Sequence, residues 1–352
     1  MTAPHDIAIS LLQQLIAIPS ISREEHGTAD LICDFFQSRN LRVERLHNNV
    51  WVKNEYFRSD KPTILLNSHH DTVKPNAGYS LDPFDSLIKA DKLYGLGSND
   101  AGGALVSLIM TFLYFNEIEN LNYNLILAAT AEEEISGSKG ISSILPSLGD
   151  IDCAIVGEPT QMQMAIAEKG LMVLDCMAKG MSGHAARDEG ENAIYKAMKD
   201  IEWFKTYNFE RESDYLGPIK MSTTLIQSGS QHNVVPDTCN FTVDVRTTDA
   251  YSNEETLAII RENVASEIKP RSTRLGPSFI SNEHPLIKSG LKLDRETFGS
   301  VTLSDQALLR VPSLKMGPGD SARSHTADEY IYLSEIKEGI QIYIDMLKMV
   351  LT

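Results

Sequence analysis

The chain has 352 residues, 42% of them hydrophobic, and carries a formal net charge of −16. This length allows two domains, and the composition is that of an ordinary globular protein. The negative charge argues against nucleic acid or an acidic membrane as a partner; it suits a cationic small substrate, although solubility alone also explains it. The four cysteines form no Cys-x-x-Cys pair, so we expect a reducing cytoplasm and neither a disulfide framework nor a zinc ribbon.

The first half of the chain alternates between helix and strand patterns. Residues 9–18 are apolar but interrupted by Gln13 and Gln14, which predicts an amphipathic helix and not a signal sequence. No apolar run reaches the roughly 20 residues that a membrane helix needs. Helices are predicted at 25–39, 101–115 and 138–148, and strands at 63–67, 123–130 and 152–156. This alternation predicts an α/β layer fold with a largely parallel sheet.

From about residue 166 the pattern becomes β-α-β-β-α-β, which is the order of a ferredoxin-like unit. We expect its strands at 171–178, 220–227, 238–246 and 271–275, and its helices at 191–203 and 253–268, the second helix capped by Asn253. A further strand at 312–316 and a helix from Ser334 follow. We therefore predict a catalytic metal-binding domain of residues 1–165 and 277–352, with residues 166–276 inserted as a second domain.

Metal-ligand side chains follow the predicted strands of the first domain. In open α/β sheets, ligands bind beyond the carboxyl ends of the strands. His69 and Asp71 share one face of an extended chain, so Asp71 can accept the second N–H of a ligating His69. Asp100, in a glycine-rich turn, is the candidate for the carboxylate that bridges two metal ions. Glu133 and Glu134 point to different sides of the chain, so one can ligate while the other reaches a water molecule. Such ligands suit zinc, with manganese or cobalt as substitutes.

These motifs, taken together, resemble those of the M20 metallopeptidase family, and in particular its acetylornithine deacetylase and succinyl-diaminopimelate desuccinylase branch. The resemblance covers nearly the whole chain, in order. The matching segments are residues 68–73, 97–103, 130–134, 157–160, 180–185, 244–246 and 316–319, the last leading to His325. Two segments depart from the family pattern: the proline after the His-x-Asp motif is displaced to Pro75, and the family's Asp-Met-Lys-Gly turn reads Asp-Ala-Gly-Gly at 100–103. Both departures leave the rim of the pocket, and hence the substrate, open.

The resemblance implies a role for each residue of the metal site. One metal ion would be held by His69 and Glu158, the other by Glu134 and His325, and Asp100 would bridge them. Glu133 would be the general base that takes a proton from the attacking water and carries it to the leaving amine. Asp71 would orient His69.

The resemblance also implies that the inserted domain is a lid that dimerises. His184 would reach the active site of the partner subunit and stabilise the tetrahedral oxyanion. Arg246 would bind the α-carboxylate of the substrate, because a guanidinium suits bidentate capture of a carboxylate, although an ordinary salt bridge is the alternative. Asn233 and Gly317 are further candidates for substrate binding.

We therefore expect a cytoplasmic, zinc-dependent amidohydrolase with two zinc ions per chain, acting on a small N-acyl amino acid as a homodimer, without nucleic acid or membrane partners. N2-acetyl-L-ornithine, a substrate in arginine biosynthesis, is the first choice. N-succinyl-ornithine, N-acetyl-citrulline, succinyl-diaminopimelate and a dipeptide are alternatives within the same class. A non-catalytic relative that uses the fold for binding or assembly is the alternative from a different class.

Overall fold

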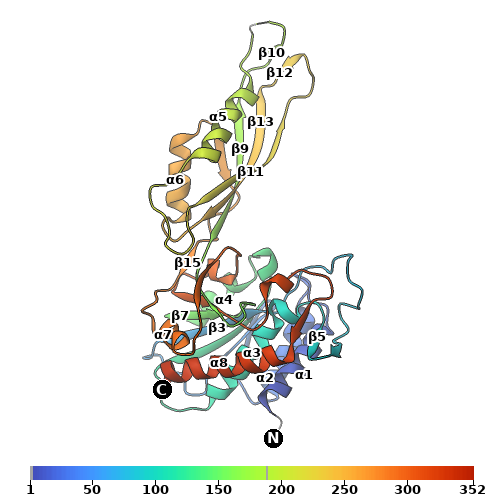
Figure 1. Cartoon of the computed structure of the whole chain (residues 1–352), viewed down its shortest axis with the longest axis vertical. Coiled ribbons are helices and arrows are strands. Elements are labelled where there is room, and N and C mark those ends of the chain that lie inside the picture. Colours follow the sequence, from blue (N-terminus) through green and yellow to red (C-terminus); the bar gives the residue numbers. More distant parts are fainter. Residues whose placement is uncertain (1–2, 188) are drawn as a thin grey trace. The chain divides into compact units, whose positions relative to one another are not determined.

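The computed structural model describes residues 3–187 and 189–352 and divides into two compact units (Figure 1). Unit 1 runs up to Ile166 and also contains Phe279–Phe298 and Ser304–Thr352. Unit 2 consists of Ala167–Ser278 and Gly299–Leu303. The action of the insertion as a lid stays a prediction.

The centre of unit 1 is a mixed sheet whose middle strands are parallel. Its strand order is β1 (Val43–Leu46), β2 (Asn49–Lys53), β6 (Asn124–Thr130), β3 (Thr63–His69), β7 (Cys153–Val156), β17 (Ser313–Lys315), β8 (Met164–Glu168) and β15 (Ser278–Phe279), with β16 (Thr297–Ser300) paired to β8. Strands β6, β3, β7 and β17 run parallel to one another, and the pairings of β1 with β2, β2 with β6 and β8 with β17 are antiparallel. The predicted α/β fold with a largely parallel sheet is confirmed.

Helices cover both faces of this sheet, which explains why its middle strands are continuously apolar. The buried strand β3 directs Ile64 and Leu66 into one core and Leu65 into the other. The first core is closed by α1 (Pro4–Ile16), α2 (His26–Gln37), α3 (Gly103–Asn116), α7 (Pro285–Leu291) and α8 (Leu333–Leu351), and the second by α4 (Ile141–Leu148). A small sheet of β18 (Tyr330–Tyr332), β5 (Lys92–Tyr94) and β4 (Ile88–Lys89) completes the unit. Within the described ranges, no helix has both the length and the apolar character needed to cross a membrane.

The register of the parallel strands brings distant segments to one edge of the sheet. His69, the last residue of β3, lies opposite Thr130, the last residue of β6, so the chain that continues to Glu133 and Glu134 starts beside His69. Asn67 lies opposite Val156 at the end of β7, two residues before Glu158. The short η1 turn (Ser98–Gly102), which carries Asp100, leads into α3.

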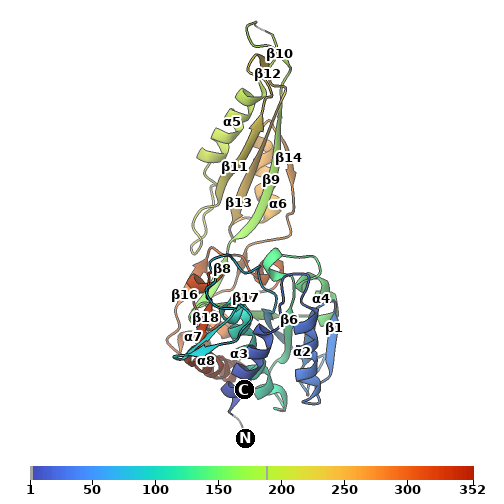
Figure 2. The same cartoon turned by 90° about the vertical axis from the view of Figure 1, so that its right-hand side faces the viewer.

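Unit 2 is a four-stranded antiparallel sheet with two helices on one face. The strand order is β11 (Lys220–Ser228), β13 (Thr238–Thr247), β9 (Gly170–Lys179) and β14 (Glu267–Pro270). Helices α5 (Ala193–Thr206) and α6 (Asn253–Asn263) share a core with this sheet (Figure 2). A separate two-stranded ribbon pairs β10 (Gly183–His184) with β12 (Val234–Val235). This order of strands and helices is the predicted ferredoxin-like one.

Two expectations for the second half of this unit are wrong. The helix predicted at 253–268 ends at Asn263, and Ile268 belongs to β14, where it pairs with Cys176 of β9. The final strand therefore precedes the predicted 271–275. The helix cap is Ser252 and not Asn253: Ser252 Oγ accepts the N–H of Glu255, and the Glu255 carboxylate accepts the N–H of Ser252. This reciprocal pair is a capping box, which a serine three residues before a glutamate forms readily.

Candidate metal centre

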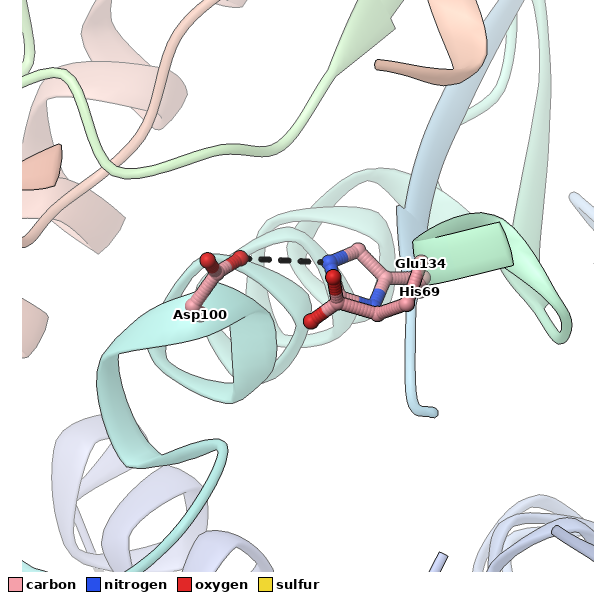
Figure 3. Close-up of side chains that lie close together, drawn as sticks. All are labelled: His69, Asp100 and Glu134. Carbon is pink, nitrogen blue, oxygen red and sulfur yellow. Dashed lines mark hydrogen bonds and ion pairs between the residues drawn. The ribbon is translucent and has the colours of Figure 1, made fainter. Parts of the chain in front are cut away.

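All the residues predicted to hold or serve the metal ions lie in unit 1, and their side chains converge. The ligand atoms of His69, Asp100 and Glu134 lie within 4.8 Å of one another, and so do those of His69, Glu133 and Glu158. Figure 3 shows the first of these groups, with the three side chains directed toward one another from the end of β3, from η1 and from η2 (Glu133–Ile135). His325 joins through Glu134, because its Nε2 lies 2.9 Å from Glu134 Oε2.

The hydrogen bonding of His69 leaves one ring nitrogen for a cation. Its Nδ1 donates to the backbone carbonyl oxygen of Asp71 at 2.9 Å, and a carbonyl can only accept. In the neutral ring, Nε2 is therefore the lone-pair nitrogen. This Nε2 faces Asp100 Oδ1 at 3.3 Å, Glu158 Oε1 at 3.7 Å and Glu133 Oε2 at 3.9 Å. A nitrogen lone pair and carboxylate oxygens repel one another, so a proton or a metal cation is needed between Nε2 and these three carboxylates.

Asp100 presents its two carboxylate oxygens to two different histidines. Oδ1 lies 3.3 Å from His69 Nε2, and Oδ2 lies 3.6 Å from His325 Nε2. The hydrogen bond of His69 and the charges of both histidines keep the pKa of Asp100 below its ordinary value, although burial alone would raise it. The arrangement is that of a carboxylate able to bridge two cations.

The other acidic groups at the centre are crowded. Burial and the charges of Asp100 and Glu134 raise the pKa of Glu158 to about 8, against the opposing effect of His69. Burial, together with the charges of Glu158 and neighbouring acids, raises the pKa of Glu133 well above its ordinary value. The hydrogen bond to Glu134 raises the pKa of His325 to about 9.

This donor set fits divalent metal ions. Buried carboxylates repel one another unless protons or cations compensate their charge, and a bound divalent ion is the strongest such compensation. Imidazole nitrogens combined with carboxylate oxygens are ligands that zinc accepts. The donors could be shared by two ions, one near His69 and Glu158 and one near Glu134 and His325, with Asp100 between them.

Asp71 supports the centre chiefly through backbone groups. Its Oδ1 accepts the N–H of Glu133 at 3.0 Å and its Oδ2 accepts the N–H of Glu134 at 3.2 Å. Ser22 Oγ donates to the same carboxylate at 2.7 Å. The carboxylate oxygen Oδ1 lies 3.5 Å from His69 Nδ1, farther than the carbonyl oxygen of Asp71 itself. Asp71 thus makes hydrogen bonds with the histidine before it and with the backbone of the two glutamates after β6, and its orienting role in the reaction stays a prediction.

Two buried acids near the centre were missed in the sequence. Glu329 accepts three backbone N–H groups from the turn that carries Asp100. Asp305 Oδ2 accepts Asn67 Nδ2 at 2.9 Å and Thr130 Oγ1 at 2.8 Å, and so links the ends of β3 and β6. Burial raises the pKa of Glu329 to about 8 and that of Asp305 to about 6. In the sequence, the position of Glu329 four residues after His325 was the one feature that could have pointed to it. Asp305 lies in none of the recognised motifs.

Gly317 lies against the backbone of Glu158. A Cβ at this position would come within 2.6 Å of the carbonyl oxygen of Glu158 and 2.9 Å of Ala104 Cβ. The backbone N–H of Gly317 donates a hydrogen bond to Thr160 Oγ1 at 3.1 Å. The close approach explains the glycine, and its contact with substrate stays a prediction.

The remaining predicted residues belong to unit 2. His184 is exposed in the β10–β12 ribbon, where it lies opposite Val234, and the carbonyl oxygen of Asn233 accepts the N–H of Ala185 at 3.0 Å. The structure therefore brings His184 and Asn233 close together. Arg246 forms a two-point ion pair with Asp244, from Nε to Oδ1 at 2.8 Å and from Nη2 to Oδ2 at 3.2 Å. The catalytic roles of these residues stay predictions.

Comparison with known proteins identifies similar chains over almost the full length. The model of peptidase family M20/M25/M40 matches residues 65–349. The acetylornithine deacetylase of Buchnera aphidicola is 26% identical over 355 residues, which cover 92% of each chain. The succinyl-diaminopimelate desuccinylase of Delftia acidovorans is 23% identical over 371 residues, covering 95% of this chain and 96% of the relative. A dinuclear metal-binding M20 peptidase of Bacillus subtilis has the same fold, with a TM-score of 0.75 at 17% identity over 99% of this chain and 98% of its own.

Proposed function

Because the chain belongs to peptidase family M20/M25/M40 and is therefore a metal-dependent amidohydrolase or peptidase, we propose that it hydrolyses the amide bond of a small N-acyl amino acid. N2-acetyl-L-ornithine, giving L-ornithine and acetate, is the first choice of substrate. The similarity to an acetylornithine deacetylase over 92% of the chain supports this choice. A desuccinylase acting on succinyl-diaminopimelate is the second candidate, supported by the similarity to the enzyme from Delftia acidovorans.

The observation that carries the proposal is the position of Asp100 between His69 and His325. Each of its oxygens faces one histidine, at 3.3 Å and 3.6 Å, and each histidine also faces a glutamate, Glu158 and Glu134 respectively. We propose two zinc ions per chain, replaceable by cobalt or manganese, with Asp100 as the shared ligand. When bound, such ions polarise the carbonyl of the amide and make water a better nucleophile at neutral pH.

Glu133 is the general base in this proposal. Its carboxylate takes a proton from the water that attacks the carbonyl carbon, and then delivers this proton to the leaving amine nitrogen as the C–N bond breaks. Two features support the assignment. The backbone N–H of Glu133 donates to Asp71, and burial together with the charges of neighbouring acids raises the pKa of its carboxylate well above the ordinary value, which favours a group that must take up a proton.

Three residues of unit 2 have proposed roles toward the substrate, and one residue of unit 1 is added to them. His184 stabilises the oxyanion of the tetrahedral intermediate in the partner subunit. Arg246 binds the carboxylate of the amino-acid part of the substrate, in exchange for part of its ion pair with Asp244. Asn233 assists beside His184. Gly317, in unit 1, lines the pocket next to Glu158.

We propose that the homodimer forms through unit 2. Strand β11 is an edge of its sheet, and it exposes Leu225 and Ile226, which are 64% and 57% accessible. On the neighbouring helix α5, Tyr195 and Met198 are 66% and 57% accessible. An edge strand with unpaired backbone groups beside exposed apolar side chains is a surface that a second copy can cover.

A hydrolysis panel tests the function. The zinc- and cobalt-loaded chain is assayed against N2-acetyl-ornithine, N-succinyl-ornithine, N-acetyl-citrulline, succinyl-diaminopimelate and dipeptides. We expect the highest kcat/KM with N2-acetyl-ornithine, and a loss of about 10²–10⁴-fold in turnover with Glu133→Gln. A preference for the succinyl compounds would replace the first choice by the second, and hydrolysis of dipeptides alone would contradict both.

A further inference from the structure

The carboxylate of Glu329 is held against the backbone of the turn that presents Asp100. Glu329 is only 2% exposed. Its Oε1 accepts the N–H groups of Asn99 at 2.8 Å and Asp100 at 2.9 Å, and its Oε2 accepts the N–H of Gly97 at 3.1 Å. An ionised carboxylate has two acceptor oxygens and can accept all three of these bonds at once, and its charge makes each of them stronger than a neutral hydrogen bond.

The conformation of the turn explains why an outside acceptor is needed. Gly97 has a positive φ of 75°, and Asp100 has φ −117° and ψ 95°, which are not helical values. In regular helix or strand, the backbone N–H groups of this segment would have carbonyl partners. Here the Glu329 carboxylate provides the acceptors, and so determines where the backbone of Asp100 lies.

Glu329 also joins this turn to the segment that carries His325. It follows His325 by four residues, and its backbone carbonyl accepts the N–H of Gly95 at 3.0 Å. The Asn99 side chain adds a second link, since its Oδ1 accepts the N–H of Asp320 at 3.0 Å. The turn is therefore bonded to residues that precede and follow His325, namely Asp320 and Glu329.

We propose that Glu329 is a positioning residue that holds Asp100 between His69 and His325 and thereby sets the affinity of the centre for its metal ions. This inference rests on the proposed metal centre and adds to it a residue that touches neither metal nor substrate. If Asp100 is displaced, its two oxygens can no longer face one histidine each. Loss of the Glu329 carboxylate should therefore weaken metal binding and lower turnover, and leave the KM for substrate unchanged. Partners of this kind typically contribute about 10- to 100-fold to metal affinity or activity.

The adjacent Asp328 supplies a matched control. Its carboxylate also accepts three hydrogen bonds, from the N–H of Ser80 at 2.8 Å, the Oγ of Ser80 at 2.5 Å and the N–H of Leu81 at 2.9 Å. These groups belong to an exposed segment that carries none of the proposed ligands. Asp328→Asn therefore removes the same charge one residue away and alters a different turn.

The test is calorimetric titration of chelator-stripped full-length chain with zinc, followed by kinetics of the zinc-loaded protein. We expect Glu329→Gln to bind zinc about 10- to 100-fold more weakly and to lose kcat without a change in KM. Asp328→Asn should retain the wild-type zinc affinity. Wild-type affinity in Glu329→Gln, or an equal loss in Asp328→Asn, would overturn the proposal. Wild-type chain that binds no zinc would instead overturn the metal centre itself.

Two further measurements apply if Glu329→Gln does not fold. Glu329→Asp keeps the charge and shortens the side chain by one methylene group, and we expect it to weaken zinc binding as well. Amide hydrogen exchange of the wild-type chain needs no variant. The N–H groups of Asn99 and Asp100 should exchange more slowly once zinc is bound, and exchange rates that are high and equal in both states would overturn the coupling.

Discussion

The carboxylate of Asp71 accepts a hydrogen bond from the backbone N–H of Glu133 at 3.0 Å, although the two residues are 62 positions apart in the chain. The same carboxylate accepts the N–H of Glu134 at 3.2 Å. Because parallel β3 and β6 end side by side, an acid just after the first strand can hold the chain just after the second. This contact connects the segment of His69 to the proposed general base.

We expect Asp71→Asn to lower kcat/KM by about 10- to 100-fold, since the amide can accept at only one of its two positions and would place an N–H group against the other backbone N–H. Zinc affinity should fall with it. Ser22→Ala is the control, because it removes one hydrogen bond to Asp71 and leaves both backbone contacts in place. Steady-state kinetics and zinc titration measure both effects, and equal losses in the two variants would contradict this role of Asp71.

Glu133→Gln should retain zinc and fold but lose about 10²–10⁴-fold in kcat, because an amide cannot take and return a proton. Glu132→Gln provides the control. Glu132 is the preceding acid, and its Oε2 accepts the N–H of Lys139 at 3.1 Å, a bond that the glutamine can keep. Metal analysis and kcat are measured on both proteins. Unchanged turnover in Glu133→Gln at full metal content would remove Glu133 from the mechanism.

Zinc should stabilise the chain strongly, because the cation binds the folded centre and relieves the repulsion among its carboxylates. When free zinc exceeds Kd about 1,000-fold, linkage adds about 4 kcal/mol to the free energy of unfolding. Thermal unfolding of stripped and reloaded protein should show the difference, and metal analysis should approach two equivalents per chain. Asp100→Asn should reduce both quantities. Equal melting temperatures with and without zinc would count against the centre.

His184→Ala should lower kcat by about 10²–10³-fold with little change in KM, since an oxyanion forms only during the reaction. If His184 acts across subunits, mixing inactive His184→Ala with inactive Glu133→Gln should restore activity after subunit exchange, because one hybrid site then contains both residues. Exchange is verified with differently tagged chains. No recovery despite proven exchange would place His184 in its own subunit or outside the reaction.

Arg246→Ala should raise KM by about 10- to 100-fold, the equivalent of the roughly 1.5–3 kcal/mol that a hydrogen bond to a charged group contributes. Arg271→Ala is a matched control from the same unit, where Arg271 pairs with Asp175 through Nε at 3.0 Å and Nη2 at 2.9 Å. KM is measured for the N-acyl amino acid and for the same compound with its carboxylate amidated. Arg246→Ala should abolish the preference between the two, and a preserved preference would show that another group binds the carboxylate.

Local sequence patterns determined which segments are strands and which acids follow them. The buried apolar runs of β3, β6 and β7 predicted parallel strands, and parallel strands end at one edge, so His69, Glu134 and Glu158 could be assigned to a common site before any coordinates. Alternation along a strand also places Arg246 and Asp244, two residues apart, on one face of β13, although the sequence did not assign Asp244 as the partner of Arg246.

Tertiary contacts decided what the local patterns left open. Ile268 follows an amphipathic helix without a glycine or proline to end it, and only its pairing with Cys176 of β9 places it in a strand. In the sequence, nothing distinguishes Glu329 from an acid on the surface. Its proposed role depends on three backbone N–H groups that lie 229 to 232 positions earlier in the chain. A sequence shows that a carboxylate is present. The fold decides which backbone N–H groups donate to it, because the directions of those N–H groups depend on the geometry of the turn and not on residue type.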